Sequence, residues 1–456
     1  MAKRALGWKR PQALHGVVRD RACGAGALLL PVLRDHLGAA AKVDAQLALA
    51  GLPNHIVGID NDPAAAWLAN VLLAAEMLPV LARTERARRR PLPALVAVAD
   101  GLAEIEGQSL VEIMNPPYGR VKLEDTERMR FADYVYGHAN LYGLFMAAGL
   151  EALQGDGVLA ALVPTSFLTG RYFEKLRDAI TKRAPLRAIE FVEDRDGAFE
   201  GVLQETCLAS FSRTRPRRAS ISTLNGHVTD VAMVSTPRSA TPWLLPRRSD
   251  DAPVAVAAAT MPLTLATAGW RVSTGPLVWN RRKGDLRAAS SDRTVPILWA
   301  ADIDGGTVHR DPARDDMRYL VLRGDDERVL VLAEPAILVQ RTTAPEQSRR
   351  LVFAPLTREL LDGWGGRVVV ENHVNVVRPA ATPLFEPLLD ATTLGRLFAT
   401  MTIDRVLRCL TGSVAVSAYE LESLPLPSAD AIATWAALGG SAFERAISAA
   451  YRPASQ

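Results

Sequence analysis

Short apolar runs alternate with longer Ala/Leu-rich segments over roughly the first half of the chain. Seven such runs lie at residues 15–18, 55–60, 94–100, 109–115, 157–164, 187–194 and 205–213. Helical segments follow several of them, and the one at residues 62–78 carries Pro63 in its first turn, where proline favours a helix start. Continuous apolar strands separated by helices are typical of a parallel sheet covered on both faces. The pattern predicts an α/β domain.

The second half has a different character. From about residue 250 the chain is richer in short strands with long loops, and a late amphipathic helix is expected over residues 394–410. This pattern indicates a separate α+β domain. We place the boundary so that residues 1–245 form the first domain and residues 246–456 the second, with residues 221–235 still belonging to the sheet.

Composition excludes several classes of protein. The chain is 48% hydrophobic and 23% charged, which is ordinary for a globular protein, and no run of about 18 uncharged apolar residues predicts a membrane span. The basic N-terminus lacks the apolar core of a signal peptide. Cys23, Cys207 and Cys409 lie far apart, so neither a disulfide framework nor a zinc site is indicated. We expect a cytoplasmic protein that binds no metal.

Basic residues are clustered although the net charge is only +3. The clusters lie at residues 83–91, 213–218, 246–248, 280–284 and 346–350. Any one of them is typical of a solvated loop. Their recurrence, mostly in the second half and near Trp270 and Trp279, favours a polyanionic partner.

Candidate ligand-binding residues follow three successive strands. The segment 20–26, DRACGAG, puts Gly24 and Gly26 between a strand and a helix, so that a ligand can approach the backbone closely. Asp60 and Asp100 end the next two strands, where carboxylates can accept from ribose hydroxyls and from an adenine amino group. Each aspartate alone is better explained by a helix N-cap or a turn. Because ligands of parallel sheets bind at the carboxyl ends of strands, the three together predict an adenosine-containing ligand.

The segment 112–121, EIMNPPYGRV, ends the fourth strand with two prolines. Pro116 and Pro117 fix φ and exclude the helical conformation just before them, so the turn is stiff. A stiff turn suits a site in which the Asn115 amide oxygen and the Pro116 carbonyl both accept from one amino group. Two such acceptors favour the pyramidal form of a conjugated amine, and Tyr118 offers a face on which its ring can stack. An ordinary Asn-Pro turn is the alternative.

Taken in order, the motifs DRACGAG, GIDNDP, ADG and NPPYG resemble motifs I to IV of the gamma-class N6-adenine DNA methyltransferases, such as the Taq-type and Pst-type modification methylases. The similarity continues through LVPTSFLTG and GAFEGVLQETCLASF to LTGSVAVSAYELESLPLP, and so covers most of the chain. The resemblance implies a Rossmann-like S-adenosylmethionine-dependent methyltransferase domain at residues 1–245. It implies an α+β target recognition domain at residues 246–456.

The resemblance also implies roles for individual residues. The cofactor S-adenosylmethionine would be held by Asp20, Ala22, Cys23, Gly24, Gly26, Asp60 and Asp100. The catalytic residues would be Asn115, Pro116, Pro117, Tyr118 and Phe199, with Phe199 on the far edge of a flipped adenine. A core phenylalanine is the alternative for Phe199.

The function so implied is site-specific methylation of adenine N6 in double-stranded DNA, as the modification component of a restriction-modification system. No nuclease segment is evident, so a separate cognate restriction endonuclease would cleave, and we expect a monomer. Two alternatives stay open. One is a methyltransferase acting on RNA or on a protein glutamine. The other is a DNA-binding module whose methyltransferase half is impaired.

Two departures from the family bear on activity. Members usually carry a Thr-Pro turn and a helix ahead of the first motif, whereas only LGWKRPQAL, with Arg10-Pro11, stands here. Arg21 follows Asp20 where proline is usual. These departures leave two explanations open, a late start of the chain or a weakened cofactor site.

Overall fold

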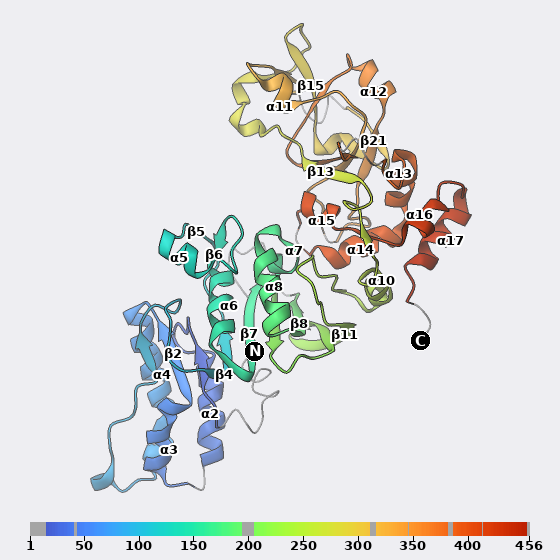
Figure 1. Cartoon of the computed structure of the whole chain (residues 1–456). Helices are drawn as coiled ribbons and strands as arrows, with labels where there is room; N and C mark the ends of the chain where they lie inside the picture. The colour runs from blue at the N-terminus through green and yellow to red at the C-terminus, as the bar shows by residue number, and fades with distance from the viewer. Residues whose placement is uncertain are drawn as a thin grey trace. The chain divides into compact units, whose positions relative to one another are not determined.

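The chain divides into two units, Met1–Thr241 and Pro242–Gln456. The computed structural model describes residues 15–40, 43–193, 205–310, 316–344, 346–381, 386–412 and 414–453 (Figure 1). The division after Thr241 lies a few residues before the boundary proposed from the sequence.

The first unit is built on a nine-stranded sheet with the order β11-β10-β8-β9-β7-β4-β1-β2-β3. Its strands are β1 (Val18–Asp20), β2 (Ile56–Asp60), β3 (Val96–Val98), β4 (Ser109–Met114), β7 (Leu153–Pro164), β8 (Leu186–Val192), β9 (Thr206–Ser212), β10 (Arg218–Asn225) and β11 (His227–Ser235). All seven predicted strands are present. The hairpin β10–β11 extends the same sheet, as expected for residues 221–235.

Strand direction departs from the prediction of a parallel sheet. The strands β3, β2, β1, β4 and β7 pair in parallel, but β9 runs antiparallel to both β7 and β8. Every residue of β9 is buried. A continuous apolar run reports burial on both faces and carries no information on direction, which is why the sequence pattern did not distinguish this strand.

Helices cover both faces of the sheet. The helices α2 (Leu29–Ala39) and α4 (Pro63–Leu81) pack against β2 and β3, whereas α6 (Leu141–Ala152) packs against β4 and β7 and beside α8 (Glu174–Arg183) (Figure 1). The crossover from β1 to β2 and the crossover from β4 to β7 run in opposite directions along the sheet. Right-handed crossovers therefore place the two helix sets on opposite faces. The shorter elements around them are α3 (Ala45–Gly51), β5 (Arg120–Val121), α5 (Asp125–Arg130), β6 (Ala139–Asn140) and α7 (Ser166–Thr169).

The helix α4 is long and apolar enough, by length and composition, to cross a membrane. Glu76 interrupts its apolar run, so the helix does not meet the criterion of an uncharged apolar stretch. In the fold it is the crossover helix between β2 and β3, and its residues Ala69, Leu73 and Met77 are buried.

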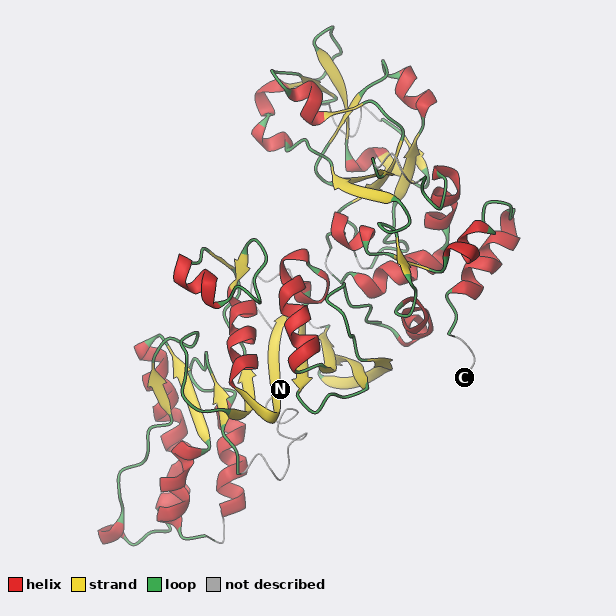
Figure 2. Cartoon of the chain, in the orientation of Figure 1, coloured by secondary structure: helices red, strands yellow, loops and turns green. Residues whose placement is uncertain are grey.

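Among its described residues the second unit combines two larger sheets and two two-stranded sheets with a group of helices (Figure 2). The small sheets pair β12 (Leu263–Thr264) with β24 (Pro425–Leu426) and β16 (Ile303–Asp304) with β17 (Thr307–Val308). Its five-stranded sheet has the order β14-β18-β15-β22-β19 and its four-stranded sheet the order β13-β23-β20-β21. The strands of these sheets are β13 (Trp270–Thr274), β14 (Leu286–Arg287), β15 (Thr294–Leu298), β18 (Tyr319–Val321), β19 (Val331–Leu332), β20 (Ala336–Gln340), β21 (Phe353–Leu356), β22 (Val368–Val370) and β23 (Val374–Pro379). The helices include α10 (Ala252–Ala258), α11 (Asp326–Leu330), α12 (Arg358–Gly363), α13 (Ala391–Ala399), α14 (Met401–Leu410), α15 (Ala418–Glu422), α16 (Ala429–Ala433) and α17 (Gly440–Ala450). Trp270, Trp435 and Tyr451 lie in a core that α10 and α13 to α17 share with the four-stranded sheet.

The single helix predicted over residues 394–410 is wrong. Two helices, α13 and α14, meet at Thr400, which has extended backbone angles. The Thr400 hydroxyl accepts from the Ile403 N–H at 3.4 Å and so caps the second helix, while it donates to the Leu397 carbonyl at 2.8 Å. A threonine that satisfies backbone groups on both sides lets one apolar pattern run through two helices.

The packing beneath β2 generates a test of the fold. A Cβ at Gly58 would lie 2.7 Å from both Leu29 Cδ1 and Val96 Cγ2. We expect Gly58→Ala to lower the free energy of unfolding by about 1–3 kcal/mol, because the buried neighbours have to move. Denaturant unfolding of the full chain followed by circular dichroism measures this. Gly38→Ala on α2 is the control, since a Cβ there meets open space. Equal stability of the two variants would contradict the packing described.

Candidate active site

The carboxyl ends of four neighbouring strands bring the predicted residues to one edge of the first sheet. The strands β4, β1, β2 and β3 are adjacent and parallel, with Asp20 opposite Gly58 and Asp60 opposite Val98. Asp20 and Asp60 end β1 and β2, Asp100 follows β3, and Asn115 follows β4. The strand order reverses at this point. From β1 the chain continues to β2 and β3 on one side, and the later strands β4 and β7 lie on the other side of β1. Such a switch point is where open α/β sheets bind ligands.

The glycine loop after β1 is tied to the end of β2. The Gly24 N–H donates to Asp60 Oδ2 at 2.7 Å, and the Cys23 N–H donates to the Ile59 carbonyl at 3.0 Å. Gly24 has a φ of +52°, and a Cβ at that position would meet nothing within 4 Å. The loop therefore needs glycine for its conformation, and the space beside it is open to a ligand.

Asp20 is buried and only partly satisfied. Its side chain has 1% exposure, and its Oδ1 accepts from the Ala22 N–H at 3.1 Å. Oδ2 has no hydrogen-bond partner among the residues that the structure describes. Burial raises the pKa of the Asp20 carboxyl to about 8, with smaller contributions from Glu112 and Asp60. An orphaned carboxyl oxygen beside the glycine loop suits a cationic or hydrogen-bond-donating ligand group.

Cys23 lies in the same loop and is buried. Burial, followed by the charges of Asp20 and Asp60, raises the pKa of its thiol to about 12. The thiol stays protonated at neutral pH, which argues against Cys23 as a nucleophile.

Asp100 is exposed and closes a turn. Its Oδ1 accepts from the Leu102 N–H at 2.9 Å, which leaves Oδ2 for a ligand. The next residue must be glycine, because a Cβ at Gly101 would lie 1.9 Å from the Arg21 carbonyl oxygen. The turn after β3 therefore rests directly on the backbone that follows Asp20.

The Asn-Pro-Pro-Tyr segment presents Asn115 to solvent while Pro116 is buried. The Tyr118 hydroxyl lies 3.3 Å from Asn115 Oδ1 and 3.1 Å from the Leu162 carbonyl, and its single proton can be donated to either. The Tyr118 ring meets the Tyr142 ring edge-on at 6.1 Å. Burial raises the pKa of the Tyr118 hydroxyl to about 12, so this phenol is neutral at pH 7 and is no general base.

Phe199 lies outside the described residues. The other predicted residues belong to the same segments: Ala22 and Gly26 to the glycine loop after β1, and Pro117 to the turn after β4. Among the described residues no group of three His, Cys, Asp or Glu side chains is arranged to hold a metal ion.

Three charged side chains behind this edge were missed in the sequence. Arg19 lies on β1, Arg21 follows that strand, and Glu112 lies on β4. All three side chains are buried, with exposed fractions of 3% for each arginine and 0% for Glu112. The signal was available, because Glu112 interrupts an apolar strand just before Asn115.

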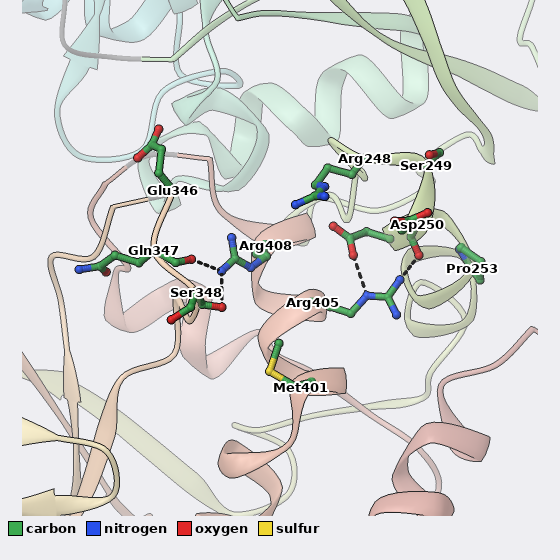
Figure 3. Close-up of a pocket in the computed structure, with 11 residues that line it drawn as sticks. Arg248, Ser249, Asp250, Pro253, Glu346, Gln347, Ser348, Met401, Arg405 and Arg408 are labelled. Carbon is green, nitrogen blue, oxygen red and sulfur yellow. Dashed lines mark hydrogen bonds and ion pairs between the residues drawn. The ribbon is translucent and has the colours of Figure 1, made fainter.

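The second unit has a cavity of about 820 Å³ where two of the predicted basic clusters meet (Figure 3). Arg248 comes from one cluster, Gln347 and Ser348 from the other, and Arg405 and Arg408 from α14. Two of the arginines are paired, Arg405 with Asp251 at 2.7 Å and Arg408 with Asp404 at 2.8 Å. The Arg248 side chain is exposed and makes no hydrogen bond or ion pair with described residues, so its guanidinium is available to an anion, while its carbonyl accepts from the Asp251 N–H at 3.0 Å.

The raised pKa of Asp20 predicts a dependence of stability on pH. The folded chain retains a proton up to about pH 8 that the unfolded chain loses near pH 3.8, so this residue makes the fold less stable as pH rises between those values. Asp20→Asn keeps the acceptor for the Ala22 N–H and cannot ionise. We expect its melting temperature to rise relative to that of the parent protein as pH increases from 5 to 8.5. Melting curves that stay parallel over this range would contradict the assignment.

Comparison with known proteins gives consistent results. Residues 110–198 match the family described as Eco57I restriction-modification methylase. The type II methyltransferase M.BsuBI of Bacillus subtilis is 23% identical over 329 residues, which cover 70% of this chain and 65% of that protein. M.PstI of Providencia stuartii is 24% identical over 330 residues, covering 69% and 64%. The chain thus spans a little under two thirds of the length of these relatives.

Solved structures bear on the fold alone. The type IIL restriction-modification enzyme MmeI, in complex with DNA, has a TM-score of 0.50 at 12% identity and covers 99% of this chain and 70% of its own. The type ISP restriction-modification enzyme LlaBIII, bound to DNA, has a TM-score of 0.51 at 8% identity, covering 92% and 37%. The predicted Rossmann-like α/β fold of the first unit is confirmed. Residues 110–198 are thus similar to the Eco57I restriction-modification methylase family, and the chain is similar to type II methyltransferases over about 70% of its length, as its motifs predicted.

Proposed function

We propose that this protein transfers a methyl group from S-adenosylmethionine to N6 of adenine in double-stranded DNA, as the modification component of a restriction-modification system. The observation that carries the proposal is the convergence of Asp20, Asp60, Asp100 and Asn115 at one edge of the sheet. The carboxylates of Asp60 and Asp100 beside an open glycine loop suit an adenosine, and the buried carboxyl of Asp20, which keeps its proton up to about pH 8 in the unliganded chain, would lose that proton to pair with a cationic tail. A rigid amide next to them suits a planar amine.

The residues present fit the cofactor. Asp60 Oδ2 already accepts from Gly24 and Oδ1 from the Asp62 N–H at 3.0 Å, yet each carboxylate oxygen has a second lone pair for a ribose hydroxyl. Asp100 Oδ2 would accept from the adenine amine, and Asp20 would take the methionine ammonium. Ala22, Cys23, Gly24 and Gly26 would form the wall along the methionine chain. When bound, S-adenosylmethionine supplies the electrophilic methyl group.

Asn115 and Pro116 would bind the target amine. Their oxygens would accept both protons of N6 and so hold its lone pair toward the methyl group, without a base of matched pKa. Tyr118 supports this arrangement in two ways. Its face would carry the adenine, and its hydroxyl can move its hydrogen bond from Asn115 to the Leu162 carbonyl, which frees the amide oxygen for the substrate. Pro117 keeps the turn rigid.

A paired adenine hides N6 within the duplex, so the base has to flip out. Phe199 is kept as the residue proposed for its far edge. The second unit would act as the target recognition domain. Arg281 and Lys283 are exposed there and Arg248 lines the cavity, which suits contacts to phosphates. A monomer in the cytoplasm and a separate cognate endonuclease complete the proposal.

The amine-binding role predicts the effect of Asn115→Ala. Without the amide oxygen the amine stays conjugated, so methyl transfer should fall by at least about 10²-fold while cofactor affinity changes little. Tritium transfer from S-adenosylmethionine to DNA from an unmodified host measures the first, and calorimetric titration the second. Tyr118→Ala should likewise lower transfer more than cofactor affinity. Asn54→Ala, at an exposed asparagine in the same unit, is the control. Unchanged transfer in Asn115→Ala would rule out this role.

Binding through phosphates predicts a strong dependence on salt. We expect DNA affinity to fall at least tenfold between about 50 and 200 mM salt, because counterions are released on binding. Arg281→Ala should reduce the slope of log affinity against log salt by about one. Fluorescence anisotropy with labelled duplexes measures both quantities, and a flat salt dependence would contradict a phosphate-dominated interface.

A further inference from the structure

A buried ion network lies between β1 and β4, directly behind the candidate site. Glu112 accepts from Arg21 Nε at 3.1 Å, from Arg19 Nη1 at 3.3 Å and from the Ser109 hydroxyl at 2.6 Å. One carboxylate is thereby shared by two arginines that have almost no contact with water. Such a network gives little net stability, since desolvation offsets the attraction. Its location suggests another role.

Arg21 connects three segments that carry the candidate site. It directly follows Asp20, and it is paired with Glu112, three residues before Asn115. Its Nη1 also donates to the Gly101 carbonyl at 3.0 Å and to the Ala103 carbonyl at 3.4 Å, in the turn that Asp100 opens. The planar guanidinium can reach a carboxylate and two carbonyls at once because its donors point in fixed, different directions.

The turn after Asp100 is held by a second arginine. Arg130, at the end of α5, donates to the Leu102 carbonyl, which lies between the two carbonyls that Arg21 binds. Three successive carbonyls of the turn therefore each accept from an arginine. A cavity of about 330 Å³ opens beside them, lined by both arginines and by Gly107 and Glu151. Hydrogen bonds to these two side chains thus fix the turn on a side where packing is incomplete.

We propose that Arg21 is a positioning residue that holds the Asp100–Ala103 turn in register with the strand of Asn115, and so sets the adenosine half of the cofactor site. The inference rests on the proposed function, because it assigns the turn to cofactor binding. It also gives a meaning to the residue that replaces the family's usual proline. In this chain the hydrogen bonds of Arg21 to Glu112, Gly101 and Ala103, here called the arginine clamp, would order the segment after Asp20.

The clamp can be separated from a contribution to stability. Replacing a buried ion network with apolar residues of similar size often leaves stability unchanged or raises it. The variant Arg19→Met, Arg21→Met, Glu112→Leu therefore tests positioning in a chain that is expected to fold. The single variant Arg21→Met leaves Glu112 paired with Arg19 and provides an independent test.

The experiment titrates the full chain calorimetrically with S-adenosylmethionine and with 5′-deoxy-5′-methylthioadenosine, which lacks the amino acid group. We expect Arg21→Met and the triple variant to bind both ligands at least about tenfold more weakly, with Arg21→Lys in between. Arg34→Met removes an exposed ion pair with Glu76 in the same unit and should leave both affinities unchanged. Melting temperatures of all variants are measured in parallel.

A double-mutant cycle with Asp100→Ala distinguishes positioning from general loosening. If Arg21 acts through the turn, Arg21→Met should cost less than about twofold once Asp100 is gone, because coupled residues are not additive. An equal loss in both backgrounds, or wild-type affinity in Arg21→Met, would overturn the inference. If the parent protein bound neither ligand, the proposed function itself would fail, whatever Arg21 does.

Discussion

The parallel pairing of β4, β1, β2 and β3 is the constraint on which the rest of the structure depends. Each strand is only three to six residues long, but their register sets four loops side by side at one edge. The loops then stabilise one another, as the bond from the Gly24 N–H to Asp60 and the close packing of Gly101 on Arg21 show. A shift of one strand by one residue would separate these contacts and turn the aspartates away from the edge.

The chemistry that this edge supports relies on fixed acceptors and on burial. The Cys23 thiol and the Tyr118 hydroxyl are neutral there, since burial raises the pKa of both groups. What remains is a set of oxygens held by short backbone segments. Such a site can orient an amine and a cationic cofactor at little reorganisation cost, which is the condition for electrostatic preorganisation.

Much of this arrangement could be predicted from the sequence because it resides in strand ends. Apolar runs that stop at Asp20, Asp60, Asp100 and Asn115 fix both the strands and the residues that follow them, and all of these were expected. The direction of β9 could not be predicted, since burial on both faces looks the same in either direction. The break at Thr400 was hidden for a similar reason, because one apolar stripe continues through α13 and α14. The network of Arg19, Arg21 and Glu112 depends on which strands are neighbours, and that order is a property of the tertiary fold.

In the proposed site, four strand ends together hold an adenosine-type cofactor facing a planar amine. The most direct test is a crystal structure of the full chain with a non-reactive analogue of S-adenosylmethionine and duplex DNA. We expect the analogue's ribose at Asp60, its adenine at Asp100, and a flipped adenine with its N6 within hydrogen-bond distance of the Asn115 and Pro116 oxygens. An analogue bound elsewhere, or an atom other than adenine N6 at Asn115, would contradict the proposed site.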